Sequence, residues 1–187
     1  MTKAIRIHET GGPEVLRWED VEVGDPGDGE IRVRHTAIGL NYIDTYQRSG
    51  LYPLALPLTL GMEGAGVVEA TGANVSDLKQ GDRVAYASPP PGSYSEARII
   101  GADRVVKVPD GVDDNTAAAM MLQGMTAQYL IRQIHKVSAD DTILIHAAAG
   151  GVGLIVCQWA KALGATVIGT VGNDEKAALA KAHGCDH

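Results

Sequence analysis

Cysteine is nearly absent from the 187 residues, which contain only Cys157 and Cys185. Neither belongs to a CxxC pair, so the sequence predicts no disulfide framework and no structural zinc site. The final residues, HGCDH, place His183, Cys185 and His187 at alternate positions. One interpretation is a metal site. We favour the other, a helix end followed by the start of a strand, because ligands on a frayed end are poorly positioned.

Long apolar runs and basic clusters are also missing. No stretch reaches the roughly 18 apolar residues of a membrane helix, and the N-terminal MTKAIRIHETGG lacks the apolar region of a signal peptide. The net charge is -7 at pH 7 and no run of Lys and Arg appears, which argues against a nucleic-acid surface. We therefore expect a cytoplasmic protein that engages no membrane, and nucleic acid is not an expected partner.

The sequence that is present changes in character near residue 113. Before that point, short β-type runs alternate with Gly- and Pro-rich turns, which is typical of a compact all-β unit. The runs are KAIRIHE, EIRVRHTAIGL, GAGVVEATG, DRVAYAS and RVVKVPDG. The alanine-rich segment that follows predicts a helix, capped by Asp114 or Asn115 and interrupted at Gly124. We predict two domains, residues 1–112 and 113–187.

A strand, a glycine turn, a helix and a second strand follow in DDTILIHAAAGGVGLIVCQWAKALGATVIGTVG. TILIHA predicts a buried parallel strand, and we interpret its His146 as a core residue. Gly164 is placed to end the helix. The turn departs from the dinucleotide fingerprint G-x-G-x-x-G at Ala148, which fits if φ there is negative. Because both strands and the helix are present, the turn predicts a dinucleotide site.

The predicted cofactor contacts begin at this turn. Gly150 allows the backbone to approach a pyrophosphate, and Gly153 allows the helix to pack closely on its strand. Gly151 and Val152 complete the turn at the helix N-terminus, where free N–H groups and the helix dipole favour an anion.

The end of the second strand indicates which dinucleotide binds. NAD sites usually carry a carboxylate there, roughly 20 residues after the glycines, to hold the ribose 2′-hydroxyl. Gly172 occupies that position and leaves room for a 2′-phosphate, which Lys176 is placed to neutralise. The pattern therefore favours NADPH. The alternative is that Lys176 is an ordinary solvated helix residue.

Three stretches together resemble one known family. They are AIGLNYIDTYQRSGLYPLALPLTLGMEGAGVVEATG, GDRVAYA and HAAAGGVGLIVCQWAKALGATVIGTVG. They resemble the quinone oxidoreductases of the medium-chain dehydrogenase/reductase superfamily, the group that includes zeta-crystallin. The resemblance implies an α/β plus β fold, in which an N-terminal GroES-like β domain precedes the first part of a Rossmann-type doubly wound parallel sheet.

The zinc ligands of related enzymes are not found here. Zinc-dependent relatives carry a Cys before D-x-Y-x-R-S-G and a His in G-H-E-G-A-G. This sequence has no cysteine at the first motif and Met62 in the histidine position, next to Glu63. A thioether is a poor ligand for catalytic zinc, and one carboxylate does not make a site. The sequence predicts the zinc-free branch and no metal.

Without a metal, hydride transfer to a quinone depends on positioning and hydrogen bonds. The candidate catalytic donors are Asn41, Tyr46 and Tyr52. For each tyrosine the alternative is packing with a satisfied hydroxyl group.

The resemblance also implies cofactor contacts outside the glycine turn. It places Asn41, Tyr42, Asp44 and Tyr46 beside the nicotinamide and the substrate, and Thr126 near the nicotinamide ribose or amide. Gln123 is a weaker candidate of the same kind.

Three functional interpretations remain open. The first is an NADPH-dependent quinone oxidoreductase, and the second is a zinc-free NADPH-dependent reductase of enones or enoyl thioesters. The third is a non-catalytic role as a crystallin-like or RNA-binding protein, which the acidic charge and the intact cofactor turn disfavour.

The predicted Rossmann part contains two strands, whereas such a domain needs about six. We therefore expect a fragment of a longer enzyme that binds NADPH weakly, does not reduce quinones alone, and associates through uncovered sheet surfaces. The family resemblance implies a homodimer for the full-length protein and does not extend that expectation to the present chain.

Overall fold

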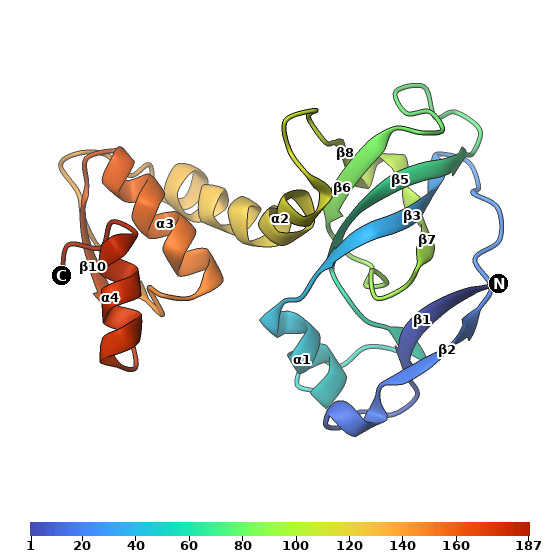
Figure 1. Ribbon diagram of the computed structural model, residues 1–187, viewed down its shortest axis with the longest axis horizontal. Coiled ribbons are helices and arrows are strands. Elements are labelled where there is room, and N and C mark those ends of the chain that lie inside the picture. The colour runs from blue at the N-terminus through green and yellow to red at the C-terminus, as the bar shows by residue number, and fades with distance from the viewer. The chain divides into compact units, whose positions relative to one another are not determined.

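The computed structural model describes all 187 residues, and the chain divides into two compact units, Met1–Leu122 and Gln123–His187 (Figure 1). Helix α2 (Asp114–Gln128) carries residues of both units. The expected domain boundary at residue 113 lies just before α2 begins and stays a prediction. None of the helices combines the length and the apolar character needed to cross a membrane.

The first unit is built on two antiparallel sheets, so the β-rich character predicted for this part is confirmed (Figure 1). The smaller sheet has the order β2-β1-β4, and the larger has the order β7-β3-β5-β6-β8. The strands are β1 (Thr2–Ile7), β2 (Arg17–Val21), β3 (Glu30–Gly39), β4 (Leu58–Thr59), β5 (Glu63–Thr71), β6 (Arg83–Ala87), β7 (Ala97–Gly101) and β8 (Val106–Lys107).

The larger sheet folds around an apolar core because its strands alternate inward and outward side chains. Ile31 and Val33 on β3 are fully buried with Val68 on β5. Burial of each such side chain contributes about 1.5–3 kcal/mol. The pairing of β3 with β5 ends where Gly39 lies opposite Glu63, and this pair begins the candidate site.

The expectation that the first part is all-β is wrong in one respect, because helix α1 (Tyr42–Ser49) lies between β3 and β4. Strands β2, β4 and β7 were also not among the expected runs. β2 carries Arg, Glu and Asp in RWEDV because it is an edge strand that pairs only with β1. Two short 3₁₀ turns, Pro13–Val15 and Ala102–Arg104, complete the unit.

Helix α2 is capped by a residue that lies one position before the expected candidates. The Asp113 carboxylate accepts the Thr116 N–H at 2.9 Å and the Thr116 hydroxyl at 2.7 Å, so Asp113 is the cap. Asp114 instead accepts the guanidinium of Arg83. The predicted interruption at Gly124 is also wrong, since α2 continues through it to a π-helical turn, Tyr129–Ile134.

The second unit confirms the predicted strand, turn, helix and strand. Its elements are β9 (Thr142–His146), α3 (Gly151–Ala162), β10 (Thr166–Thr170) and α4 (Asp174–Ala182). β9 and β10 pair in parallel, with Thr142 opposite Thr166 and His146 opposite Thr170. Gly164 has a φ of +91° and ends α3 as predicted.

Strand β9 is only partly buried, which differs from the expected buried strand. Ile143 and Ile145 pack against the apolar core of the unit, whereas Leu144 on the other face is 59% exposed. After α4, the backbone of HGCDH runs beside β10. The Asp186 N–H donates to the Val167 carbonyl at 2.8 Å, which agrees with a helix end followed by a strand-like segment.

Candidate functional site

The first unit presents its predicted site residues on α1, on the residue before it and, for Tyr52, on the segment that follows it. Asn41 precedes the helix in extended conformation, and Asp44 in the first turn accepts the Asn41 N–H at 2.9 Å. Gly50, with a φ of +83°, ends the helix. The local signals N-x-x-D and a following glycine therefore specify α1, and they were readable in the sequence.

The polar groups at the start of α1 face inward. Asn41, Asp44 and Glu63 are 7%, 3% and 0% exposed. The Asn41 Nδ2 group donates to Glu63 Oε1 at 2.8 Å, and the Tyr94 hydroxyl donates to Asp44 Oδ2 at 2.8 Å. The second Glu63 oxygen accepts the Leu122 N–H at 2.6 Å. These bonds connect α1 with β5, α2 and the loop that carries Tyr94.

Burial dominates the electrostatics of this network. It raises the pKa of the Glu63 carboxyl group above its usual range, although the hydrogen bonds from Leu122 and Asn41 oppose the change. Burial also raises the pKa of Asp44, against the bonds from Asn41 and Tyr94. Neither carboxyl group has an ion-pair partner. The predicted contacts of Asn41 and Asp44 with a cofactor stay predictions.

Three tyrosines, two on α1 and one on the segment after it, form a row of neighbouring rings. The ring centroids of Tyr42 and Tyr46 lie 5.5 Å apart, and those of Tyr46 and Tyr52 lie 5.4 Å apart. Tyr42 is 76% exposed and Tyr52 is 51% exposed. The structure contains no hydrogen bond to or from any of the three hydroxyl groups, so these groups are available to a bound molecule.

The glycine turn of the second unit has little space for side chains. A Cβ atom at Gly153 would lie 2.7 Å from the Ala148 carbonyl oxygen and closer still to that of Ala147. At Gly151 a Cβ atom would collide with the side chain of Gln123, which therefore packs over the turn. The left-handed residue is Ala147, with a φ of +53°, and Ala148 has no positive φ.

The turn leads directly into α3 and can receive an anion. Gly150 is the N-cap, and the N–H groups of Gly151, Val152 and Gly153 form the first turn, where an α-helix leaves its N–H groups without helical acceptors. A cavity of about 510 Å³ borders this turn. Its other walls come from the same unit, from the π-helical turn and from β9. The arrangement suits a phosphate group.

The proposed 2′-phosphate region lies at the end of β10. A Cβ atom at Gly172 would meet nothing within 4 Å, so the space that we inferred there is present. Asn173 caps α4 by accepting the Lys176 N–H at 2.9 Å. The Lys176 side chain is exposed and has no ion pair. Thr126, the remaining predicted contact, is partly buried on α2.

The interpretation of His146 as a core residue is wrong. His146 is exposed at the carboxyl end of β9, where its Nδ1 atom lies 3.0 Å from the Thr170 hydroxyl of β10. The residue was misassigned because a fully buried β9 was expected. It belongs instead to the edge of the sheet that carries the glycine turn.

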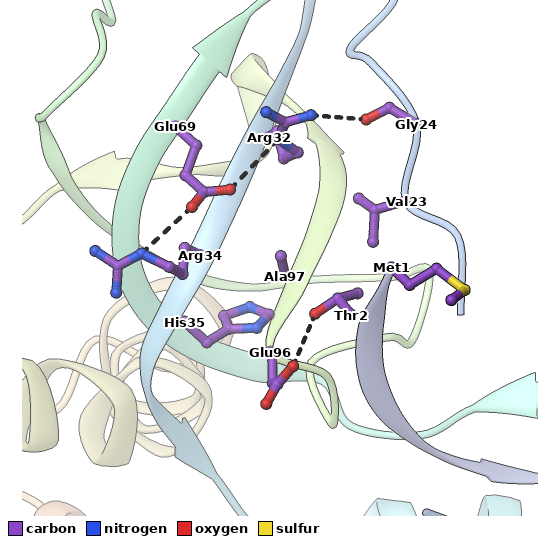
Figure 2. A pocket seen from close by; sticks show the side chains of 10 residues that line it. All are labelled: Met1, Thr2, Val23, Gly24, Arg32, Arg34, His35, Glu69, Glu96 and Ala97. Carbon is purple, nitrogen blue, oxygen red and sulfur yellow. Dashed lines mark hydrogen bonds and ion pairs between the residues drawn. The ribbon is translucent and has the colours of Figure 1, made fainter. Parts of the chain in front are cut away.

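A separate groove of about 540 Å³ in the first unit does not include the predicted residues (Figure 2). Its two arginines share one carboxylate, since Glu69 lies 3.4 Å from Arg32 and 3.3 Å from Arg34. Glu96 accepts the Thr2 hydroxyl at 3.1 Å. Because these charges are compensated within the groove, we do not assign it an anionic cofactor.

The residues around Met62 do not form a metal site. The Met62 sulfur accepts a hydrogen bond from Gln47 at 3.6 Å, and both Glu63 oxygens are occupied. No group of three His, Cys, Asp or Glu side chains in the structure is arranged to hold a metal ion, and this includes HGCDH.

Comparison with known proteins shows the family to which the chain belongs. The model of the alcohol dehydrogenase GroES-like domain matches residues 27–139, and the model described as zinc-binding dehydrogenase matches residues 151–187. The chain belongs to the alcohol dehydrogenase GroES-like domain family. The expected fold class, a GroES-like domain followed by the start of a Rossmann-type domain, is confirmed.

Individual relatives are quinone oxidoreductases and a related reductase. A quinone oxidoreductase of Pseudomonas aeruginosa is 57% identical over 98% of this chain and 57% of its own length. A 2-haloacrylate reductase of Burkholderia sp. is 50% identical over 100% of this chain and 58% of its own length. The protein in the crystal structure of Escherichia coli quinone oxidoreductase complexed with NADPH is 49% identical in sequence to this chain. The two structures superpose with a TM-score of 0.95 over 98% of this chain and 56% of the other.

These comparisons confirm the resemblance to quinone oxidoreductases that the sequence motifs indicated. The chain spans slightly more than half the length of the relatives it matches.

Proposed function

We propose that the protein takes part in NADPH-dependent quinone reduction, as a quinone oxidoreductase. The observation that carries the proposal is the glycine turn, where Gly153 permits contact between α3 and the carbonyl groups of the turn while the first N–H groups of α3 remain open. The similarity to quinone oxidoreductases, one of them complexed with NADPH, supports the same assignment.

The residues of the second unit fit NADPH. The N–H groups of Gly151, Val152 and Gly153 would bind the pyrophosphate, and the open space at Gly172 would accept the 2′-phosphate. Lys176 would neutralise that phosphate because no carboxylate of the protein competes for its ammonium group. When bound, NADPH supplies the hydride that reduces the quinone.

The residues of the first unit would handle the acceptor. Tyr46 and Tyr52 offer aromatic faces for a quinone ring and hydroxyl groups for its oxygens. Two-electron reduction adds one hydride and one proton to the quinone, and a tyrosine hydroxyl in contact with solvent can pass on that proton. Asn41 and Asp44 would shape the segment from within. Thr126 would contact the nicotinamide ribose or amide.

The experiment that tests the cofactor assignment compares NADPH with NADH in direct binding. Replacing Lys176 by Ala removes one charge-assisted contact, so we expect NADPH affinity to fall roughly tenfold, about 1.4 kcal/mol, and NADH affinity to stay constant. Lys181→Ala is the matched control, because Lys181 is also an exposed lysine of α4. An equal loss of affinity for NADPH and NADH, or an equal loss of NADPH affinity in both variants, would contradict the assignment.

A second candidate activity is the reduction of activated C=C bonds. The similarity to a 2-haloacrylate reductase favours it, and it needs the same hydride donor. Consumption of NADPH by the full-length protein with benzoquinone and with 2-chloroacrylate, measured side by side, separates the two activities. Tyr46→Phe and Tyr52→Phe should lower turnover or raise KM with the true acceptor. Unchanged kinetics would return both rings to a packing role.

The remaining expectations concern the whole protein. A zinc-free reaction, a homodimer in the full-length protein and a cytoplasmic location stay predictions. Metal analysis, sedimentation and cell fractionation test them in turn. Zinc that survives dialysis at one ion per chain would refute the first.

A further inference from the structure

Glu63 is a fully buried carboxylate that the proposed chemistry leaves without a role. It is the first residue of β5, it is 0% exposed, and no basic side chain pairs with it. Taking an unpaired carboxyl group out of water is costly, so a residue of this kind is expected to satisfy a specific requirement. Its two contacts indicate what that requirement is.

Both contacts of Glu63 come from donors. Oε1 accepts the Asn41 side-chain amide at 2.8 Å, and Oε2 accepts the Leu122 N–H at 2.6 Å. Only a group that accepts at both oxygens satisfies this pair. A glutamine presents one acceptor and one donor, so its NH₂ group would face another N–H.

The neighbouring backbone leaves room for this carboxylate. Gly39 pairs with Glu63 across the sheet, and a Cβ atom at position 39 would collide with the Glu63 side chain and with the Ala118 carbonyl oxygen. A glycine on β3 therefore allows Glu63, α2 and the start of α1 to meet.

We propose that Glu63 is a positioning residue that orients the Asn41 side chain, and with it the first turn of α1, against α2. The functional part of this inference rests on the proposed function, because it requires bound NADPH and the predicted contact of Asn41 with the nicotinamide. The local part rests only on the hydrogen bonds of the first unit.

The local part is tested by NMR on the 187-residue chain. Hydrogen exchange of the Asn41 side-chain amide reports its bond to Glu63, and Asn41→Ala assigns the signal by its loss. In Glu63→Gln we expect this exchange to accelerate at least tenfold. Glu69→Gln is the matched control, because Glu69 is also on β5 but pairs with arginines. Unchanged exchange in Glu63→Gln would overturn the proposal.

The functional part is tested by the Kd for NADPH. We expect Glu63→Gln to raise the Kd roughly tenfold and Glu69→Gln to leave it unchanged. The double variant Asn41→Asp/Glu63→Gln reverses donor and acceptor, so that the new carboxylate accepts from the new amide, whose oxygen still accepts the Leu122 N–H. Its Kd for NADPH should be at least threefold lower than that of Glu63→Gln, and its melting temperature should return to that of the wild type.

The outcomes separate the two proposals. If the wild type binds no NADPH, the proposed function fails, and the exchange measurement still decides the role of Glu63. A lower melting temperature with an unchanged Kd would make Glu63 merely structural and overturn its positioning role. If Glu63→Gln does not fold, a folded double variant supports the reciprocal bond, and failure of both variants refutes it.

Discussion

Acidification should destabilise the first unit through His35. Its Nδ1–H donates to the Ser95 carbonyl at 2.6 Å, which makes Nε2 an acceptor for the Tyr86 hydroxyl at 2.7 Å. Burial, followed by the charge of Arg98, lowers the pKa of His35 to about 4 from 6.5, although the bond to Ser95 opposes the change. The folded unit therefore requires a neutral ring.

The size of the effect follows from proton linkage. The unfolded chain binds a proton at this histidine below about pH 6.5, whereas the folded chain resists it until about pH 4. Stability is therefore lost as the pH falls through this window. At about pH 5 the loss should be about 2 kcal/mol, approaching about 3.4 kcal/mol below pH 4.

Urea unfolding at about pH 7.5 and about pH 5 measures this loss. In a Trp159→Phe background, Trp18 is the remaining tryptophan and reports on the first unit. His35→Asn keeps a donor for Ser95 but does not titrate. Other groups titrate equally in both proteins, so the wild type should lose about 2 kcal/mol more than the variant. Identical pH dependence of the two proteins would refute the neutral, half-buried histidine.

Three further predictions concern stability, measured by urea unfolding. Gly153→Ala should cost the second unit at least about 2 kcal/mol, since the new Cβ atom meets backbone carbonyls, while Gly172→Ala should change it by less than about 0.5 kcal/mol. Similar costs for both would show that the turn is not close-packed. Ala147→Gly should stabilise the second unit by about 0.5–1 kcal/mol by relieving the positive φ, and a loss would contradict that strain. Asp114→Ala should cost the first unit about 1–2 kcal/mol, because it leaves Arg83 without its carboxylate. Hydrogen bonds from Thr36 and Arg83 lower the Asp114 pKa, so this cost should shrink as the pH falls below about 4, and a constant cost would argue against the pairing.

Local patterns predicted the elements whose signals lie close together in the chain. The β9–α3–β10 succession was readable because a β-branched run, a glycine turn and a helical period follow one another within about 30 residues. The start of α1 was readable in principle from Asn41 and Asp44, but β-type runs on both sides concealed it. Cap assignment at α2 failed by one residue because three acidic or amide side chains stand in a row.

The environment of the candidate site was decided by contacts between distant residues. Tyr94 reaches Asp44 across 50 positions, and Leu122 reaches Glu63 across 59. A single sequence contains no local signal for such pairs. The sequence therefore drew attention to Asn41 and Asp44 as predicted site residues, without revealing that the Asn41 side chain donates to a buried carboxylate.

The sequence by itself indicated the class of this protein, because the stretches that resemble quinone oxidoreductases, with the glycines of the turn among them, are chemical identities that need no coordinates. Only the tertiary structure decided which side chains remain available. It buried Glu63 and exposed His146, the reverse of what a glutamate and a strand-borne histidine suggest. The physical reason is that burial depends on which surfaces of the sheets are covered, and that follows from packing between elements rather than from the order of residues.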